Sequence, residues 1–333
     1  MTTQISFFFG ASQPMADDDV DLDLLRDSAR DFLAERGEKE SVADLAALDW
    51  TGLLVDERMG GAGWRPVETC VIAEELGRAR DRSAWFGTTM AAAALMHAPD
   101  AVRECWLPAM LNGTATAGLA LAGDVVRVFR GAEVDIVITL GRKGIHLFEL
   151  SDGQQRRPDE DSMDVARAVC LVDIADIQGV LIGSPERADQ LLALGKLLVS
   201  ADSVGAVSMT LQRLTAYLKD RIAFGAPIAS FQAVQHRLVE LFVFEVKARA
   251  AVMKAARAVA ADDERVAALT AVAHAFVAAR ATAAVDECMQ LSGGIGFTWE
   301  YPLHHELRRV FTNAQSLGTA RSSRALLAEV SGW

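Results

Sequence analysis

The stretch that most constrains the fold is 221–236, because it joins two long runs of helical periodicity. The run before it, at about 189–220, repeats small and apolar residues at helical spacing. The run after it carries residues such as Leu238 along one face. Between them, Phe224-Gly-Ala-Pro227 predicts a turn, since glycine permits unusual dihedral angles and proline stops a helix. The stretch therefore predicts two long helices connected by a short turn.

Two side chains in this stretch have chemistry that a simple connector does not need. Arg221 offers a planar fork suited to phosphate oxygens, and Gln232 offers an amide donor just beyond the turn. Taken alone, they are equally consistent with an ordinary connector whose arginine is solvated. A second stretch, Gln290–Pro302, ends another helix in a glycine cluster, where bare backbone can approach a large ligand.

The two stretches together are far more specific than either alone. The pattern RxxFGxPIxxFQ, followed about 60 residues later by QLxGGxGFxxEYP, resembles the C-terminal domain of the acyl-CoA dehydrogenase flavoprotein family. The resemblance is clearest over 195–324, and a weaker match runs through 45–120. It implies FAD as the cofactor, with Arg221 against the pyrophosphate and the second motif against the adenosine diphosphate half, across a subunit interface. The residues implied for the cofactor site are Arg221, Phe224, Gln232, Gln290, Gly293, Gly294 and Thr319.

The order of local patterns along the chain is helices, short strands, then helices again. Amphipathic or apolar periodicity predicts helices at 20–35, 66–80, 86–98 and 99–112. Short apolar runs separated by Gly, Asp and Arg predict strands at 116–122, 134–140, 145–150, 168–174 and 180–182. Ser184 and Pro185 then suit the cap and first turn of the next helix.

This order matches the architecture that the resemblance implies. The expected fold is mainly α, with an N-terminal helical domain, a reduced middle β domain and a C-terminal four-helix bundle. The expected boundaries are a disordered leader at 1–14, the helical domain at 15–115, the β domain at 116–184 and the bundle at 185–333. Within the first domain, Ala73–Arg78 resembles the family's EELGR, although Glu-Glu-Leu is also common on solvated helices.

Composition excludes several classes of function. The net charge of −12 argues against a nucleic-acid binder, and the lack of a run of about 18 apolar residues predicts no membrane span. The cysteines Cys70, Cys105, Cys170 and Cys288 are scattered, so they are expected to be reduced and buried in a cytoplasmic protein. Adjacent residues point apart on a helix, so the pair His304-His305 is not expected to bind a metal.

The chain departs from the family in the middle domain. Typical members carry a loop of the form TEPxxGSD, which lines the flavin ring and the acyl thioester. Here the chain reads Leu119-Ala-Leu-Ala-Gly-Asp124, without the Thr, Glu and Ser-Asp of that loop. The surface that would orient the reactive part of FAD is therefore incomplete.

A second departure concerns the catalytic base. The family's reaction removes a proton α to a thioester carbonyl while a β hydride passes to the flavin, and a desolvated carboxylate suits that proton transfer. In most members this Glu lies in YEGT, shortly after EYP, and the matching residue here is Leu317. A minority place the Glu on the helix that leads into RxxFG, where Gly195 stands. Neither residue can accept a proton, so we expect no catalytic residue in this chain.

Other polar residues near these positions have ordinary explanations. Lys196 could touch a phosphate of CoA, but a solvated helix lysine is the preferred interpretation. Asp202 and Glu245 are carboxylates on helices of the same domain, and buried-polar or helix-charge roles are preferred for them. His236 follows Gln232 by one helical turn, and a structural role is preferred over a catalytic one.

A short middle domain without a base resembles the smaller subunit of heteromeric α2β2 acyl-CoA dehydrogenases, known in actinobacterial steroid catabolism. The resemblance implies a longer acyl-CoA dehydrogenase-like partner that supplies the glutamate, an acyl-CoA substrate and an electron-transfer flavoprotein as electron acceptor. Two alternatives remain open. One is a homo-oligomeric flavoenzyme, either a monooxygenase or a dehydrogenase with an atypical base, and the other is a flavin-free structural paralogue.

Overall fold

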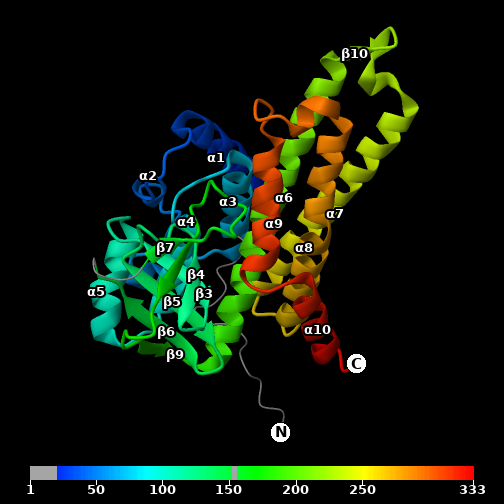
Figure 1. Ribbon diagram of the computed structural model, residues 1–333. Helices are drawn as coiled ribbons and strands as arrows, with labels where there is room; N and C mark the ends of the chain where they lie inside the picture. The colour runs from blue at the N-terminus through cyan, green and yellow to red at the C-terminus, as the bar shows by residue number, and fades with distance from the viewer. Residues whose placement is uncertain (1–20, 152–155) are drawn as a thin grey trace.

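The computed structural model describes residues 21–151 and 156–333, and the expected leader at 1–14 lies outside them. The first part of the described chain is helical (Figure 1). Its helices are α1 (Leu22–Arg36), α2 (Ala43–Ala46), α3 (Pro66–Ala79), α4 (Trp85–Leu95) and α5 (Asp100–Leu111). Between α2 and α3, the short strands β1 (Leu54–Val55) and β2 (Gly63–Trp64) pair antiparallel around the 3-10 turn η1 (Glu57–Met59).

The middle part is a small β domain in two sheets. The larger sheet has the order β3 (Ala117–Leu121), β5 (Ile136–Gly141), β6 (Gly144–Glu149) and β9 (Val180–Gly183). The smaller sheet has the order β4 (Val125–Val128), β8 (Cys170–Asp173) and β7 (Arg156–Pro158). Only the β3–β5 pair is parallel among the described strands. Sequence patterns missed β4 and β7, because these strands are short and each contains arginine.

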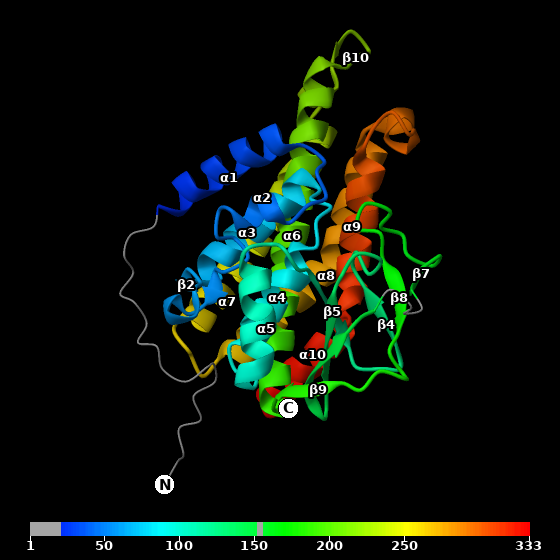
Figure 2. The ribbon, with the colours of Figure 1, turned by 90° about the vertical axis from the view of Figure 1, so that its left-hand side faces the viewer.

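The last part is a helical bundle. It contains α6 (Pro185–Asp220), α7 (Gln232–Ala260), α8 (Val266–Leu291) and α9 (Leu303–Ser316), and α10 (Ala320–Val330) packs on α8. Figures 1 and 2 show α6 running the length of the molecule, beside the β sheets at one end and beyond them at the other. The predicted mainly α fold with a small middle β domain and a C-terminal bundle is confirmed. At the start of α6, the Ser184 hydroxyl accepts the backbone N–H of Arg187 at 3.4 Å, as the cap pattern predicted.

Close backbone contact fixes the N-terminal helices to the bundle. A Cβ on Gly205 would overlap the carbonyl oxygen of Glu74, and a Cβ on Gly77 would overlap that of Asp202. Helices α3 and α6 can therefore approach each other this closely because glycine stands on each side of the crossing. The core of the molecule follows α6, whose Leu191, Leu194 and neighbouring residues are fully buried.

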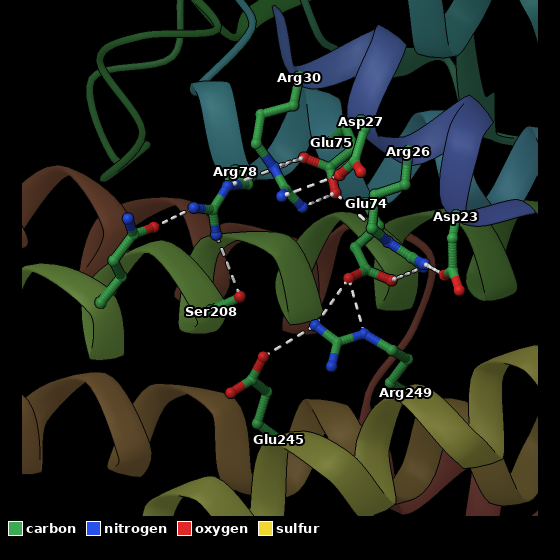
Figure 3. A network of polar contacts seen from close by, with 11 residues as sticks. Asp23, Arg26, Asp27, Arg30, Glu74, Glu75, Arg78, Ser208, Glu245 and Arg249 are labelled. Atoms are coloured by element: carbon green, nitrogen blue, oxygen red, sulfur yellow. Dashed lines mark hydrogen bonds and ion pairs between the residues drawn. The ribbon is translucent and has the colours of Figure 1, made fainter.

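Polar residues of α1, α3, α6 and α7 form a network at this crossing (Figure 3). Arg30 donates two hydrogen bonds to the Glu75 carboxylate, at 2.9 and 3.2 Å. Glu74 accepts a hydrogen bond from Arg249 of α7 at 2.8 Å. Because both glutamates are nearly fully buried, the interpretation of this segment as a solvated helix surface is wrong. The pairs instead link α1 and α7 to α3.

Two helices of the described chain are long and apolar enough to span a membrane by length and composition, so the prediction that the chain lacks such a stretch is wrong. They are α6 and α8, and the structure buries 78% of the most apolar window of α6 and 44% of that of α8 within the protein. Core helices of water-soluble proteins meet the same criterion when their apolar faces pack against neighbours. Both helices here pack inside the bundle.

Candidate cofactor site and base positions

The Phe224 turn is a strained hairpin at the tip of the bundle. Strands β10 (Ile222–Ala223) and β11 (Ala226–Pro227) pair antiparallel around Phe224 and Gly225, whose φ angles are 52° and 81°. Left-handed φ is expected for the glycine but costs energy for the phenylalanine. The Phe224 side chain is 99% exposed, and its ring meets Phe231 edge-on with the centroids 6.3 Å apart. Apart from this edge contact, the described residues leave the ring open to solvent.

Arg221 and Gln232 flank this hairpin. The backbone N–H of Arg221 caps α6 by donating to Tyr217 at 2.9 Å, and its carbonyl accepts the N–H of Ile228 at 2.9 Å. Gln232 is the first residue of α7. Both side chains are exposed, and within the described ranges neither makes a hydrogen bond or ion pair. The protruding hairpin and the start of α7 therefore carry an unpaired guanidinium, an unpaired amide and an exposed aromatic ring close together in sequence.

The second motif forms the 3-10 turn η3 (Gly293–Phe297) at the end of α8, where Gln290 is exposed. Glycine is required at two positions of η3 for different physical reasons. A Cβ on Gly296 would overlap the carbonyl oxygen of Met289, and Gly293 has φ +66°. Gly294 has neither constraint, because a Cβ there would meet nothing within 4 Å. Its bare backbone is therefore available to a group from outside the chain.

Helices α6 and α8 end on the same side of the bundle, so the hairpin and η3 lie at the same end of the molecule (Figure 1). The ring contact between Tyr217 near the end of α6 and Tyr301 after η3, with centroids 5.6 Å apart, links the two segments. The β sheets lie toward the opposite end in both ribbon views. The features at the tip fit a large anionic ligand with a planar ring, and they face away from this chain's own β domain.

Thr319 lies apart from this group. It is the N-cap of α10, where its hydroxyl accepts the N–H of Ser322 at 3.3 Å and Ser322 reciprocates in a capping box. The helix α9 separates it from η3, and 14 helical residues span about 21 Å. The structure therefore brings six of the seven predicted cofactor residues to one end of the bundle and leaves Thr319 at the other.

The two positions that hold alternative glutamates in the family come together in space. A Cβ on Gly195 of α6 would lie 2.7 Å from Cδ1 of Leu317, which follows α9 and is almost fully buried. The same point would be 3.4 Å from Cε of Met90 and 3.5 Å from Cδ2 of Leu119. The convergence was not apparent from the sequence, where the two positions are far apart. The three nearest neighbours of this point are apolar side chains, and neither Gly195 nor Leu317 can itself accept a proton.

Lys196, beside this point, is 8% exposed, so its interpretation as a solvated helix lysine is wrong. Burial lowers the pKa of its amine. The Nζ atom lies 3.7 Å from the place that a Cβ on Gly318 would take. His274 is also buried there and hydrogen-bonds through Nδ1 to Ser323 at 2.8 Å. Burial, and then the charge of Lys196, lowers the pKa of His274 to about 4, so this histidine is neutral at pH 7.

The remaining carboxylates have structural partners. Asp202 is buried and accepts hydrogen bonds from Arg309 at 2.6 and 2.9 Å and from Asn313 at 2.6 Å. Burial alone would raise the pKa of Asp202, but the charges of Arg309 and Arg167 hold it below its ordinary value. Glu245 accepts a hydrogen bond from Arg249 at 2.8 Å. His236 is exposed on α7, one turn from Gln232.

Two smaller expectations need correction. The rings of His304 and His305 do not point apart, since their centroids are 4.0 Å apart. Within 21–151 and 156–333, however, no group of three His, Cys, Asp or Glu side chains is arranged to hold a metal. Cys105 is exposed, whereas Cys70, Cys170 and Cys288 are buried as expected.

Comparisons with known proteins agree with this arrangement. The profile described as "Acyl-CoA dehydrogenase, N-terminal domain" matches 20–114, and "Acyl-CoA dehydrogenase, C-terminal domain" matches 186–332. The chain is 33% identical over 292 residues to acyl-CoA dehydrogenase IpdE2 of Mycobacterium tuberculosis, covering 86% of each chain. It is 32% identical over 280 residues to IpdE2 of Mycolicibacterium smegmatis, covering 84% of this chain and 83% of the relative.

Solved structures share the fold. A variant of the Tcur3481-Tcur3483 steroid ACAD superposes with a TM-score of 0.83 and 22% identity, covering 93% of this chain and 97% of that one. Butyryl-CoA dehydrogenase from Megasphaera elsdenii superposes with a TM-score of 0.79 and 21% identity, covering 96% and 100%. These two structural similarities show a shared fold. The sequence matches to both terminal domains and to IpdE2 show the family. The chain belongs to the acyl-CoA dehydrogenase family.

Proposed function

We propose that this chain is the short subunit of a heteromeric, FAD-dependent acyl-CoA dehydrogenase that desaturates an acyl-CoA thioester between its α and β carbons. In this proposal the chain holds part of FAD, and a longer acyl-CoA dehydrogenase-like partner supplies the catalytic glutamate. The observation that carries the proposal is the contact between the positions of Gly195 and Leu317. Both places where the family keeps its base meet at one apolar contact of the core, so neither supplies a base, and in this proposal the partner does.

The tip of the bundle supports a role in holding FAD. The guanidinium of Arg221 would bind the pyrophosphate through charge-assisted hydrogen bonds, and the exposed ring of Phe224 would cover a planar part of the cofactor. Gln232 and Gln290 would donate amide hydrogens, while the bare backbone at Gly293 and Gly294 admits close approach. When bound, FAD supplies the hydride acceptor for the desaturation. This chain's contribution is to bind and orient the cofactor.

The distance between the tip and the β domain supports a partner subunit. The hairpin and the β sheets lie toward opposite ends of the molecule (Figures 1 and 2), which favours a cofactor shared between the tip of one subunit and the β domain of another. The position of Thr319 beyond α9 fits the same scheme, since it would contact a different FAD from the one at the tip. The loop 119–124 also lacks the family's flavin-facing residues, so the partner's loop would orient the flavin ring.

The wider setting that we propose is the breakdown of lipids or steroids in the cytoplasm, with an electron-transfer flavoprotein as electron acceptor. A steroid substrate is supported by the steroid ACAD that shares the fold. The net charge of −12 favours neither nucleic acid nor an anionic membrane surface as a partner. Nothing on the apolar lining around Leu317 selects a particular acyl group.

The test is to purify the chain alone and together with a longer acyl-CoA dehydrogenase-like subunit from a neighbouring gene. Flavin absorbance per chain is measured for each sample, and CoA esters are assayed with an artificial electron acceptor. We expect about one FAD per pair of unlike chains and turnover in the heteromer alone, because general-base catalysis contributes about 10²–10⁴-fold in rate. Full flavin content with turnover by the lone chain would favour the homo-oligomeric flavoenzyme. Absence of flavin from both samples would favour the flavin-free paralogue.

A further inference from the structure

Lys196 is the one lysine of the chain that the structure buries. The other lysines are all exposed, and they are Lys39, Lys143, Lys219, Lys247 and Lys254. Lys196 lies on α6 and is 8% exposed. Within the described ranges its amine makes no hydrogen bond or ion pair. A buried amine without an acceptor is unfavourable, so a group from outside the chain is expected to stabilise it.

A second buried group near this amine also lacks a partner. His274 of α8 is 1% exposed, and its Nδ1 shares a hydrogen bond of 2.8 Å with the hydroxyl of Ser323 of α10. The other ring nitrogen, Nε2, has no partner among the residues that the structure describes. The charge of Lys196 reaches this imidazole, since it adds to the effect of burial in lowering the pKa of His274. Three helices thus bring an amine, an imidazole and a hydroxyl to one buried region.

Gly318 leaves room beside the amine. A Cβ on Gly318 would lie 3.7 Å from Nζ of Lys196, at ordinary van der Waals distance, and 2.9 Å from Oγ of Ser322. Because residue 318 is a glycine, with φ +107°, no side chain of its own occupies that point. The position directly precedes the start of α10, and the N-terminal end of a helix favours a negative charge. The space therefore suits a group of a few atoms that carries a negative charge.

We propose that Lys196 is a site of reversible carbamylation by carbon dioxide. The lone pair of the uncharged amine attacks the carbon of CO2, and an N–C bond forms. One C=O π bond breaks, its electron pair moves to oxygen, and one proton leaves Nζ for water. The product is a carbamate, whose carboxylate accepts a hydrogen bond from Nε2 of His274 when Ser323 donates to Nδ1. The step requires neither FAD nor the longer subunit, so it goes beyond the function proposed above.

Two properties favour this amine over the exposed ones. CO2 reacts with the uncharged form of an amine, and an ordinary lysine with a pKa of about 10.4 is only about 0.1% uncharged at about pH 7.4. Burial lowers the pKa of Lys196, although the charge of Asp189 opposes the shift, so a larger fraction of this amine is uncharged. The narrow exposure that remains also suits a reactant as small as CO2 better than a bulky one.

The first test is carbon-13 NMR of the full-length chain in labelled bicarbonate. We expect a carbamate signal that Lys219→Met retains and Lys196→Met loses. Lys219 is the matched control because it is an exposed lysine of the same helix. Lys196→Arg keeps a positive charge and should also lose the signal, so the test does not depend on the methionine variant alone. Circular dichroism and thermal unfolding show that each variant is folded.

The second test traps the adduct with a trialkyloxonium salt, which esterifies the carboxylate, and locates the ester by peptide mass spectrometry. The ester should be at least about tenfold more abundant on Lys196 than on Lys219, because each unit by which a pKa falls raises the uncharged fraction about tenfold. His274→Phe should lower the occupancy of Lys196 about tenfold, since one charge-assisted hydrogen bond is lost.

Three results would overturn the proposal. They are the absence of a carbamate signal at every bicarbonate concentration, a signal that persists in Lys196→Met, and equal trapping on Lys196 and Lys219. Flavin content and acyl-CoA turnover are measured on the same samples. Failure of the proposed function would appear in those two measurements, whereas failure of the carbamate proposal would appear only in the adduct.

Discussion

Gly195 and Leu317 touch across the interface of α6 and the end of α9: a Cβ on Gly195 would lie 2.7 Å from Cδ1 of Leu317. The glycine leaves the space that the leucine fills. One apolar contact thus occupies both positions at which the family can place a base. The side chains that replace the carboxylate are consequently part of the packed core. A glutamate introduced at either position would disturb that packing.

We expect Leu317→Glu to lower the free energy of unfolding by about 1–3 kcal/mol, because a polar group would enter an apolar contact. The variant should also show no acyl-CoA dehydrogenase activity as a lone chain. Urea unfolding and an assay with an artificial electron acceptor measure the two effects. Leu317→Met, which nearly conserves volume, is the control and should remain close to the parent in stability. Activity gained by Leu317→Glu alone would contradict the need for a partner.

Arg221→Ala should reduce FAD affinity in the assembled enzyme about tenfold or more without unfolding it. The reason is the loss of a charge-assisted contact, worth about 1.5–3 kcal/mol, from a side chain that is exposed and free in this chain. Flavin retained after dialysis, together with the thermal unfolding temperature, is the measurement. Lys219→Ala removes a neighbouring exposed charge and should leave flavin content unchanged. Equal flavin content in both variants would argue against this motif as the pyrophosphate contact.

The two neighbouring glycines Gly294 and Gly296 should respond differently to alanine. Gly294→Ala should keep the stability of the parent but weaken flavin binding, because the new methyl group meets only space that a ligand would use. Gly296→Ala should destabilise the fold by about 1–3 kcal/mol, because its methyl group would overlap the carbonyl oxygen of Met289. Denaturant unfolding and flavin titration separate the two effects. The reverse pattern would mean that the ligand does not approach Gly294.

The buried pair of Asp202 and Arg309 should make stability depend on pH at the acid end. Arg309 holds the pKa of Asp202 below its ordinary value of 3.8 in the folded state. The stabilisation is therefore present above that value and is lost as the pH falls through the lowered folded pKa. Unfolding free energies measured from pH 7 to pH 3 should show this loss in the parent.

Asp202→Asn should be destabilised by about 3–5 kcal/mol at pH 7, because Arg309 would remain buried without its counter-charge. Its stability should also lose the acid-dependent component that Asp202 contributes. Asp49→Asn, at an exposed position, is the control and should behave like the parent. An Asp202→Asn variant with parent-like stability at pH 7 would show that the pair is dispensable.

The sequence alone predicted most of the longer helices and the strands β3, β5, β6, β8 and β9, and it revealed the two motifs and the replacement of the family's glutamate. Helical and strand periodicities are local, so residues such as Leu194 and Leu197 reveal their element without knowledge of the rest of the fold. The motifs are equally local, because each lies within about a dozen consecutive residues. The replacement of the family's glutamate by Leu317 can be identified directly from the sequence. Very short strands such as β7 were not predicted, because they contain too few residues to show an alternating pattern.

Only the tertiary structure decided which of these residues meet. The contact between Gly195 and Leu317, the separation of Thr319 from Gly294, and the burial of Glu74 and Lys196 all depend on how helices distant in sequence cross. Local periodicity shows that a helix has an apolar face, but not which other element covers it. The crossing of α3 and α6 brings backbone so close that charged side chains beside it become buried. The burial and the contacts of a side chain cannot be predicted from local sequence, because they depend on atoms contributed by other segments of the chain.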